Sequence, residues 1–155
     1  MDYQKTIKVK TTKEKAFTAV TQEINQWWGN VDTDQANQIG NKFSIYFENN
    51  TKWRFTITKL NKFNEVHWKC IYANHTSRDL NGINDEWLNS EVIFEFKDLG
   101  NDEVELFLKH KGLTPELNCY QMCDAGWTHF FANSLKQYLE TGKGAPNLVE
   151  RQGKS

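Results

Sequence analysis

Two cysteines and a histidine in the last third of the chain are the residues best suited to chemistry. Cys119 and Cys123 are four residues apart, so on a helix they lie on one face. With His110 they would supply three metal ligands, but a structural zinc site needs four, and the spacing shows no fourth. Neighbouring Cβ atoms on a helix are about 5–6 Å apart, whereas a disulfide needs about 3.5–4.5 Å. We therefore interpret the pair as small buried hydrophobic side chains and predict no metal site.

His110 stands near the end of a predicted strand, on its inward face. One interpretation is a polar anchor at the edge of a pocket, or a group that titrates as an acid or base. The other is a core or rim histidine whose nitrogens bond to Tyr120 or to backbone carbonyls, which we favour because buried polar groups normally find partners. His67 has the opposite parity and is predicted to lie at the surface.

Further polar motifs give weaker signals. A catalytic triad, a glycine-rich phosphate loop or paired metal carboxylates are not visible, so we predict no cofactor and leave open whether the protein is an enzyme. Gly142-Lys143-Gly144 follows a predicted helix and therefore reads as a helix stop. Asp85-Glu86 and Arg54 could orient a ligand, although a solvated surface role is the simpler interpretation.

Three tryptophans lie next to predicted loops. Trp27, Trp28 and Trp87 either anchor the core or line the entrance of a pocket or a partner surface, where tryptophan is enriched. The sequence does not separate these alternatives.

The composition excludes several classes of protein. The 155 residues suit one domain, with residues 1–146 as the domain and 147–155 as a polar tail. The formal net charge is −1 without long runs of one sign, so we expect no nucleic-acid partner. No apolar stretch approaches the ~20 residues of a membrane span. The amino terminus lacks an apolar signal segment, and three cysteines suit a reducing compartment, so we expect a cytoplasmic protein.

The periodicity predicts an α+β order of elements. A strand over 3–10 precedes a helical segment that starts at Thr11 or Thr12, is broken into two short helices, and ends at Gly29. A loop over 30–40 precedes five alternating strands, over 42–48, 52–60, 65–72, 91–97 and 103–111. A long polar loop over 74–89 interrupts them, with Trp87 holding its end. One long amphipathic helix then runs from near Pro115 to Leu139.

The alternation also predicts which side chains face the long helix. A curved antiparallel sheet wrapped around a helix often leaves a gap, and an apolar gap with a few polar groups is the default ligand site. The alternative is a solid aromatic core. The candidate ligand-binding residues are Trp28, Phe43, Ile45, Phe47, Trp53, Phe55, Trp68, Tyr72, Phe94, Phe96, Leu108, His110, Tyr120, Cys123, Trp127 and Phe131.

Local motifs extend this interpretation to a family. They are Glu86-Trp87 and the segments 90–96, 108–113, 126–127 and 134–144. These motifs resemble the START-like (SRPBCC) superfamily, and within it the family named after the activator of the heat-shock chaperone ATPase. The resemblance covers residues 7–146. It implies a helix-grip fold, in which a curved antiparallel sheet of about six strands wraps around one long carboxyl-terminal helix, with two short helices after the first strand.

Three functions are compatible with this resemblance. The first is a binding domain that holds a hydrophobic or aromatic small molecule between sheet and helix, oriented by His110, Tyr120 and Tyr72. The second is a protein-interaction module that acts on a chaperone through an exposed apolar patch near Trp27, Trp28 and Trp87, as a monomer or weak dimer. The third is an enzyme resembling a cyclase or hydratase, in which His110 faces an open cavity.

Overall fold

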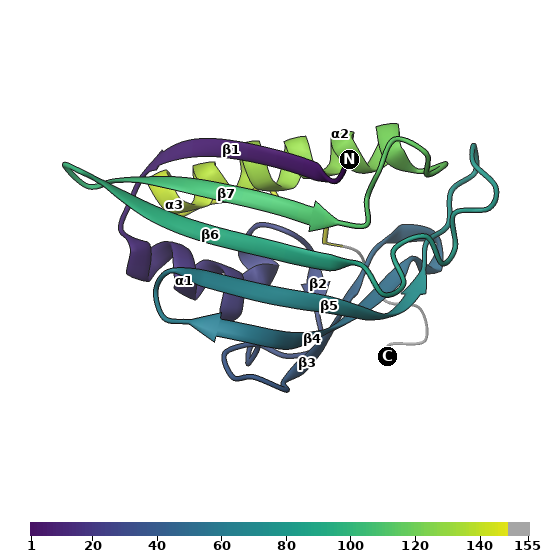
Figure 1. Ribbon diagram of the computed structural model, residues 1–155, viewed down its shortest axis with the longest axis horizontal. Helices are drawn as coiled ribbons and strands as arrows, with labels where there is room; N and C mark the ends of the chain where they lie inside the picture. Colours follow the sequence, from purple (N-terminus) through teal and green to yellow (C-terminus); the bar gives the residue numbers. More distant parts are fainter. Residues whose placement is uncertain (149–155) are drawn as a thin grey trace.

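One antiparallel sheet organises the molecule. The computed structural model describes residues 1–148, and within them seven strands pair in the order β1-β7-β6-β5-β4-β3-β2 (Figure 1). Strands β2 to β7 lie next to one another in chain order, and β1 pairs with β7 to form the other edge of the sheet. The strands are β1 (Tyr3–Lys10), β2 (Asn30–Val31), β3 (Lys42–Tyr46), β4 (Lys52–Asn61), β5 (Glu65–Asn74), β6 (Glu91–Gly100) and β7 (Glu103–Lys111).

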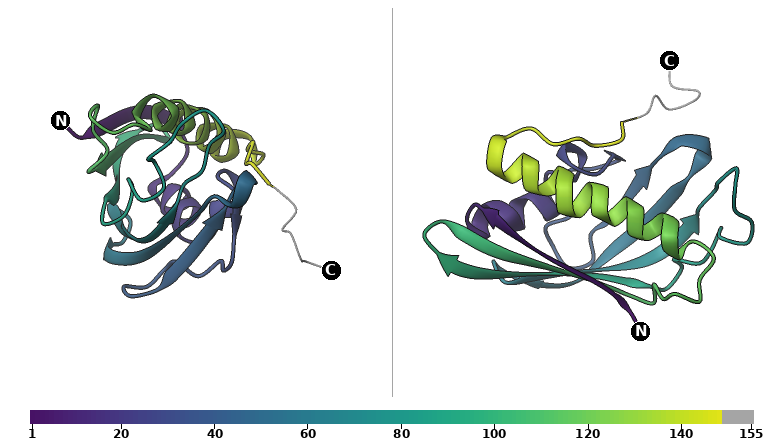
Figure 2. Two further views of the ribbon diagram at one scale, coloured as in Figure 1. Left: turned by 90° about the vertical axis from the view of Figure 1, so that its right-hand side faces the viewer. Right: turned by 90° about the horizontal axis from the view of Figure 1, so that it is seen from above.

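A long helix crosses the concave face of this sheet (Figure 2). Its first part is α2 (Tyr120–Trp127), its middle is a π-helical segment, η3 (Thr128–Leu135), and its last part is α3 (Lys136–Thr141). Gly142 ends it in a left-handed conformation at φ 86°, as predicted for the Gly-Lys-Gly segment. The sheet and this helix form the α+β helix-grip fold that the sequence predicts.

Short helices connect the first strands. Thr12 caps α1 (Lys13–Thr21), because its side chain accepts a hydrogen bond from the Lys15 amide at 3.2 Å. The 3₁₀ turn η1 (Ile24–Gln26) follows, so the predicted pair of short helices is confirmed. A second 3₁₀ turn, η2 (Glu48–Asn50), makes the tight turn between β3 and β4. Asn49 and Asn50 have positive φ there, as their residue type predicts.

The structure differs from the sequence-based expectation at three places. The predicted loop over 30–40 begins with β2, whose two residues pair with Ile45 and Tyr46 at the sheet edge. The long helix begins at Tyr120 rather than near Pro115, because residues 114–118 form turns that bond Leu117 to Thr114 and Tyr120 to Leu117. The predicted tail over 147–155 also differs at its start, since the Asn147 amide donates to the Trp28 carbonyl at 3.0 Å. Residues 149–155 lie outside the described part.

A bulge in β5 reverses the predicted face of one side chain. Phe55 pairs with Cys70, but Arg54 pairs with Tyr72, so Ile71 is an extra residue in β5. Tyr72 therefore lies on the outer face of the sheet, 46% exposed, with the Lys52 ammonium 5.3 Å from its ring centre. The alternation rule placed Tyr72 inward, and it fails because the bulge shifts the parity by one residue.

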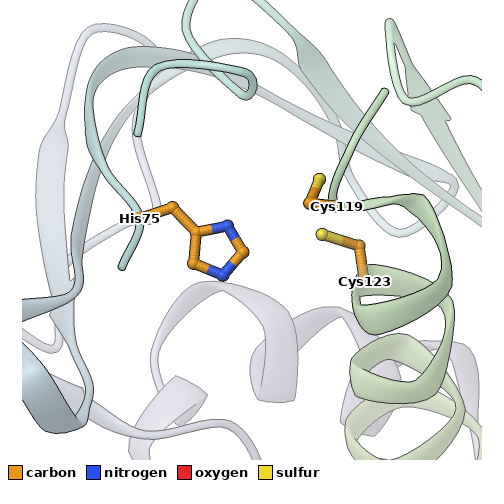
Figure 3. Close-up of side chains that lie close together, drawn as sticks. All are labelled: His75, Cys119 and Cys123. Carbon is orange, nitrogen blue, oxygen red and sulfur yellow. The ribbon is translucent and has the colours of Figure 1, made fainter. Parts of the chain in front are cut away.

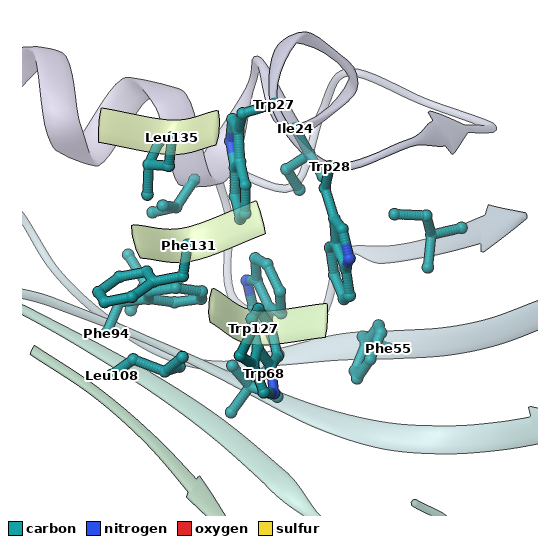
Figure 4. Close-up of a cluster of buried hydrophobic side chains, with 14 of the residues drawn as sticks. Ile24, Trp27, Trp28, Phe55, Trp68, Phe94, Leu108, Trp127, Phe131 and Leu135 are labelled. Atoms are coloured by element: carbon teal, nitrogen blue, oxygen red, sulfur yellow. The ribbon is translucent and has the colours of Figure 1, made fainter. Parts of the chain in front are cut away.

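Aromatic side chains fill most of the space between helix and sheet (Figure 4). The Trp28 ring lies 5.1 Å from Trp127 of the helix and 5.7 Å from Trp68 of β5. Phe131 and Leu135 extend this cluster along the helix and are fully buried. Each of these large rings removes some 150–250 Å² from water, so this layer supplies much of the stability of the fold.

Candidate functional site

A cavity of about 230 Å³ remains at one end of the space between helix and sheet. It lies where α2 passes over the turn between β3 and β4 and over the loop that follows β5. Its side near Glu48 reaches solvent, because Glu48 is exposed. The lining residues are Trp28, Phe47, Glu48, Thr51, Trp53, His75, Thr76, Trp87, Met122, Cys123, Gly126, Trp127, Phe130 and Asn147.

Four tryptophans belong to the apolar wall of the cavity. Trp87 stacks on Trp53 at 4.2 Å between ring centres, and its ring is nearly parallel to that of Trp127 at 6.0 Å. Trp28 completes the wall against Trp127. These rings come from β4, the loop after β5, α2 and the turn after η1, so the wall exists only in the folded chain.

Two polar atoms at this wall form no hydrogen bond among residues 1–148. They are Nε1 of Trp53 and Nδ1 of His75, and both are buried. A buried polar group without a partner costs roughly 1–3 kcal/mol. Trp53 and His75 both line the cavity, and the Trp53 indole is an unpaired donor beside it.

Hydrogen bonds between two turns hold His75 in place. The Thr76 amide donates to Oγ1 of Thr51 at 3.1 Å, and the Thr76 hydroxyl donates to the Asn49 carbonyl at 2.6 Å. The His75 amide donates to the Asn84 carbonyl at 3.0 Å. The segment after β5 is thus fixed on both sides, and the His75 ring packs 4.9 Å from the Trp53 ring.

His75 also meets the two cysteines of the helix start (Figure 3). One ligand atom each of His75, Cys119 and Cys123 lies within 4.8 Å of the others, and all three residues are buried. The cysteines are free thiols. The hydrogen bond with Cys123 and burial raise the pKa of the Cys119 thiol above its ordinary value.

Two residues of the loop after β5 support this cluster. The Glu86 carboxylate accepts hydrogen bonds from the amides of Asn118 and Cys119, both at 2.9 Å, and so caps the start of α2. The Trp87 indole donates to Sγ of Cys123 at 3.3 Å. Glu86 therefore has a structural role at the helix start, in place of the ligand-orienting or solvated role considered from the sequence.

The predicted ligand-binding residues divide into groups. Five of them line the cavity: Trp28, Phe47, Trp53, Cys123 and Trp127. Eight are buried in the core away from the cavity: Phe43, Ile45, Phe55, Trp68, Phe94, Phe96, Leu108 and Phe131. Tyr72 lies on the outer face. Tyr120 packs edge-on against Tyr3 at 6.1 Å, outside the cavity lining.

His110 is a core histidine. It is fully buried, its Nδ1 accepts from Nε1 of Trp127 at 3.1 Å, and its Nε2 lies 2.9 Å from the Ser90 hydroxyl. Burial lowers its pKa to about 3. Its partners are therefore Ser90 and Trp127 rather than Tyr120, and it does not face the cavity as the enzyme alternative requires. It is also not the histidine near the cysteines.

Sequence reasoning missed several cavity residues, above all His75. This histidine lies in a polar loop without periodicity, so its burial depends on contacts with residues distant in sequence. The signal that could have found it was the combination of a long loop with a tryptophan near its end.

The predicted exposed patch was also wrong, because Trp27, Trp28 and Trp87 are each at most 4% exposed.

The fold and the cavity define this chain as a START-like helix-grip protein. A family model described as "Activator of Hsp90 ATPase homolog 1-like protein" matches residues 10–140. The chain belongs to this family. A comparison with curated protein sequences gives no match. Among residues 1–148, no helix combines the length and apolar character needed to cross a bilayer.

Solved structures share this fold at low sequence identity. The solution structure of the Aha1 dimer from Colwellia psychrerythraea has a TM-score of 0.73 and 23% identity, over 93% of this chain and 99% of that one. An Hsp90 activator from Plasmodium falciparum has a TM-score of 0.58 and 21% identity, over 85% and 91% of the two chains. A Staphylococcus saprophyticus protein has a TM-score of 0.69 and 14% identity, over 96% and 98%. At these identities the likeness concerns the fold.

Proposed function

We propose that this protein binds a small aromatic or hydrophobic molecule in the cavity beneath α2. The observation that carries the proposal is the wall of four tryptophans, one of which, Trp53, has a buried indole N–H without a hydrogen-bond partner among the described residues. Such a combination of apolar surface and a few polar groups is typical of ligand sites.

The volume limits the size of the ligand. The cavity, at about 230 Å³, exceeds an engineered apolar cavity of roughly 150 Å³ that binds benzene. It is smaller than the roughly 300–1,000 Å³ of sites for drug-sized molecules. A molecule of one or two rings with one hydrogen-bond acceptor fits these limits, because the Trp53 indole is a donor. Affinity would come mainly from apolar burial, at ~25 cal/mol per Å².

The six tryptophan indoles provide an internal test by NMR. A panel of one- and two-ring aromatic probes should shift the indole N–H signals of Trp28, Trp53, Trp87 and Trp127, which line the cavity. The signals of Trp27 and Trp68 should stay in place, because these two rings lie in the core away from the cavity. A panel that shifts none of the signals, or all six equally, contradicts the proposal.

Two neighbouring substitutions in the helix test whether the probes bind inside the cavity or elsewhere on the protein. Gly126 faces the cavity, and a Cβ added there meets no atom within 4 Å, so Gly126→Leu should fill the space and abolish binding. Ala125 is exposed on the same helix, so Ala125→Leu should bind the probes as the parent protein does. Equal binding by both variants would place the ligand elsewhere.

Family membership favours a second candidate, binding to an Hsp90-type chaperone. The solved structures of similar fold include a dimeric Aha1 and an Hsp90 activator. A pull-down with the cognate chaperone and an ATPase assay test this candidate. Unchanged chaperone turnover at saturating protein would count against it.

A further inference from the structure

The cluster of His75, Cys119 and Cys123 has the composition of a metal site. The cluster brings two sulfurs and one imidazole nitrogen together within 4.8 Å, at the side of the cavity that His75 and Cys123 also line. Thiolate and imidazole are the ligands that zinc prefers in proteins. We propose that these three residues bind Zn²⁺, and that the fourth coordination position faces the cavity.

The geometry is close to that of a bound ion. Zinc–sulfur and zinc–nitrogen bonds of about 2.3 and 2.0–2.1 Å place tetrahedral ligands about 3.5–3.8 Å apart. The three ligand atoms, within 4.8 Å of one another, need to approach by about 1.3 Å at most. Cys119 and Cys123 are related by one helical turn, as the Cys123 amide bonds to the Cys119 carbonyl at 2.8 Å. This i, i+4 arrangement lets two side chains reach one ion, as in zinc-binding helices.

His75 supplies the independent observation that points to a ligand. It is 6% exposed, its Nδ1 makes no hydrogen bond of good geometry in the described part of the chain, and its ring faces the two sulfurs (Figure 3). An imidazole nitrogen left unpaired at such burial is costly, and a metal bond would satisfy it. The loop that carries His75 is held by the hydrogen bonds to Thr51 and Asn84, so the ring is positioned before any ion arrives.

The charge balance also suits zinc. Binding converts two thiols to thiolates and releases two protons, so Zn²⁺, two thiolates and a neutral imidazole form a site without net charge. A neutral site avoids the cost of a buried unpaired ion. Glu86 holds the Cys119 amide at 2.9 Å and so positions the backbone of this ligand.

An open fourth position distinguishes this site from a structural zinc site. Structural sites are closed by four protein ligands, whereas sites with three protein ligands keep one position for water or another molecule. In the described residues the cluster contains three such ligands, and it borders the cavity proposed above to hold a small molecule. A ligand atom with a lone pair could therefore bind the ion directly, and this part of the inference rests on the proposed function.

The test uses the whole protein, reduced with a phosphine and freed of metal. Zinc is titrated against a chromogenic chelator, and cobalt(II) replaces zinc for spectroscopy. We expect one ion per chain, a thiolate-to-cobalt charge-transfer band and the intense visible bands of tetrahedral cobalt. His75→Ala, Cys119→Ser and Cys123→Ser should each weaken binding by more than about 10-fold. Absence of one-to-one binding by the reduced parent protein would overturn the inference.

Cys70 provides the matched control. It is buried and free like the other two cysteines, but its thiol donates to the Tyr72 carbonyl at 3.2 Å, outside the cluster. Cys70→Ala should bind zinc as the parent protein does, and an equal loss of zinc binding in this variant would overturn the inference.

A second measurement needs no variant and therefore holds even if a substitution prevents folding. Adding zinc to the parent protein should raise its melting temperature. No rise would count against the site.

Two further measurements keep this inference distinct from the proposed function. Azide added to the cobalt protein should shift its visible bands, and an unchanged spectrum would overturn the open position. Gly126→Leu should abolish binding of aromatic probes but retain one zinc ion per chain. Loss of zinc in a folded Gly126→Leu variant would overturn the assignment of the three residues as sufficient to hold the ion, whereas failure of the aromatic probes alone would leave the metal site intact.

Discussion

The indole Nε1 of Trp127 donates a hydrogen bond to Nδ1 of His110 at 3.1 Å. Because an indole can only donate, Nδ1 must accept, and the proton of the neutral imidazole lies on Nε2. Nε2 then donates to the Ser90 hydroxyl at 2.9 Å, which donates to the Trp87 carbonyl at 2.6 Å. This chain connects the helix, β7 and the start of β6, and it requires that His110 stay uncharged.

The stability of the fold should therefore depend on pH through His110. Burial lowers its pKa in the folded protein to about 3, against an ordinary value of 6.5. Between these values the unfolded chain binds one more proton than the folded chain. The free energy of unfolding should thus fall as pH falls from about 6.5 toward 3, by at most about 1.4 kcal/mol per pH unit.

Urea unfolding at pH 7, 5.5 and 4.5 measures this effect. His110→Gln can retain one of the two hydrogen bonds but does not titrate, so we expect it to be less stable at pH 7 by about 1–3 kcal/mol. Its loss of stability on acidification should be smaller than that of the parent protein. If both proteins lose stability equally from pH 7 to 4.5, His110 is not the responsible group.

The two indoles Trp27 and Trp53 should respond differently to replacement by phenylalanine. Nε1 of Trp27 donates to the Ala19 carbonyl at 2.8 Å, whereas Nε1 of Trp53 has no partner in the described residues. Trp27→Phe loses a buried hydrogen bond in addition to volume, so it should cost about 1 kcal/mol more than Trp53→Phe. Urea unfolding of the two variants at neutral pH compares them, and the reverse order would contradict this assignment.

The cap on α2 should be measurable through Glu86. Its carboxylate accepts two amide hydrogen bonds at the helix start, so Glu86→Gln, which removes the charge, should lower the free energy of unfolding by about 1–2 kcal/mol. Asp85→Asn removes a charge from an exposed neighbour and should change stability by less than about 0.5 kcal/mol. Chemical denaturation measures the free energy of unfolding of both variants. An equal loss in the two would contradict the capping role of Glu86.

Gly144 should not tolerate a side chain. A Cβ there would meet the backbone carbonyl oxygens of Gln26 and Ser134, neither of which can rotate away. Gly144→Ala should therefore lower the melting temperature. Gly126→Ala is the matched comparison, because it meets open space within a helix and should stabilise the protein by about 0.5–1 kcal/mol. An unchanged melting temperature of Gly144→Ala would contradict the close approach of Gly144 to these two carbonyl oxygens.

Much of the fold could be predicted because the apolar side chains alternate. Phe43, Phe55 and Trp68 follow this pattern and are buried as predicted. Tyr72 breaks it, because a bulge is a property of two paired strands and leaves no mark in one of them. The late start of the long helix has a similar origin, since the amides that begin it bond to Glu86, about thirty residues earlier.

The cavity could be anticipated only in part. Trp28, Trp53 and Trp127 line the cavity, and the sequence predicted them as candidates from their inward parity or their position next to a loop. The cysteine pair was also visible from its spacing, but the histidine beside it was not. His75 reaches the cysteines across more than forty residues, through turns that bond to Thr51 and Asn84.

Apart from the short strand β2, the sequence alone was sufficient for the order of strands and helices, the family, and the aromatic character of the interior, because periodicity and local motifs act over a few residues. The tertiary structure decided which histidine stays uncharged in the core, which one meets the two thiols, and where a space remains open. Those outcomes depend on packing between segments distant along the chain, and a linear pattern does not encode the distance between such segments.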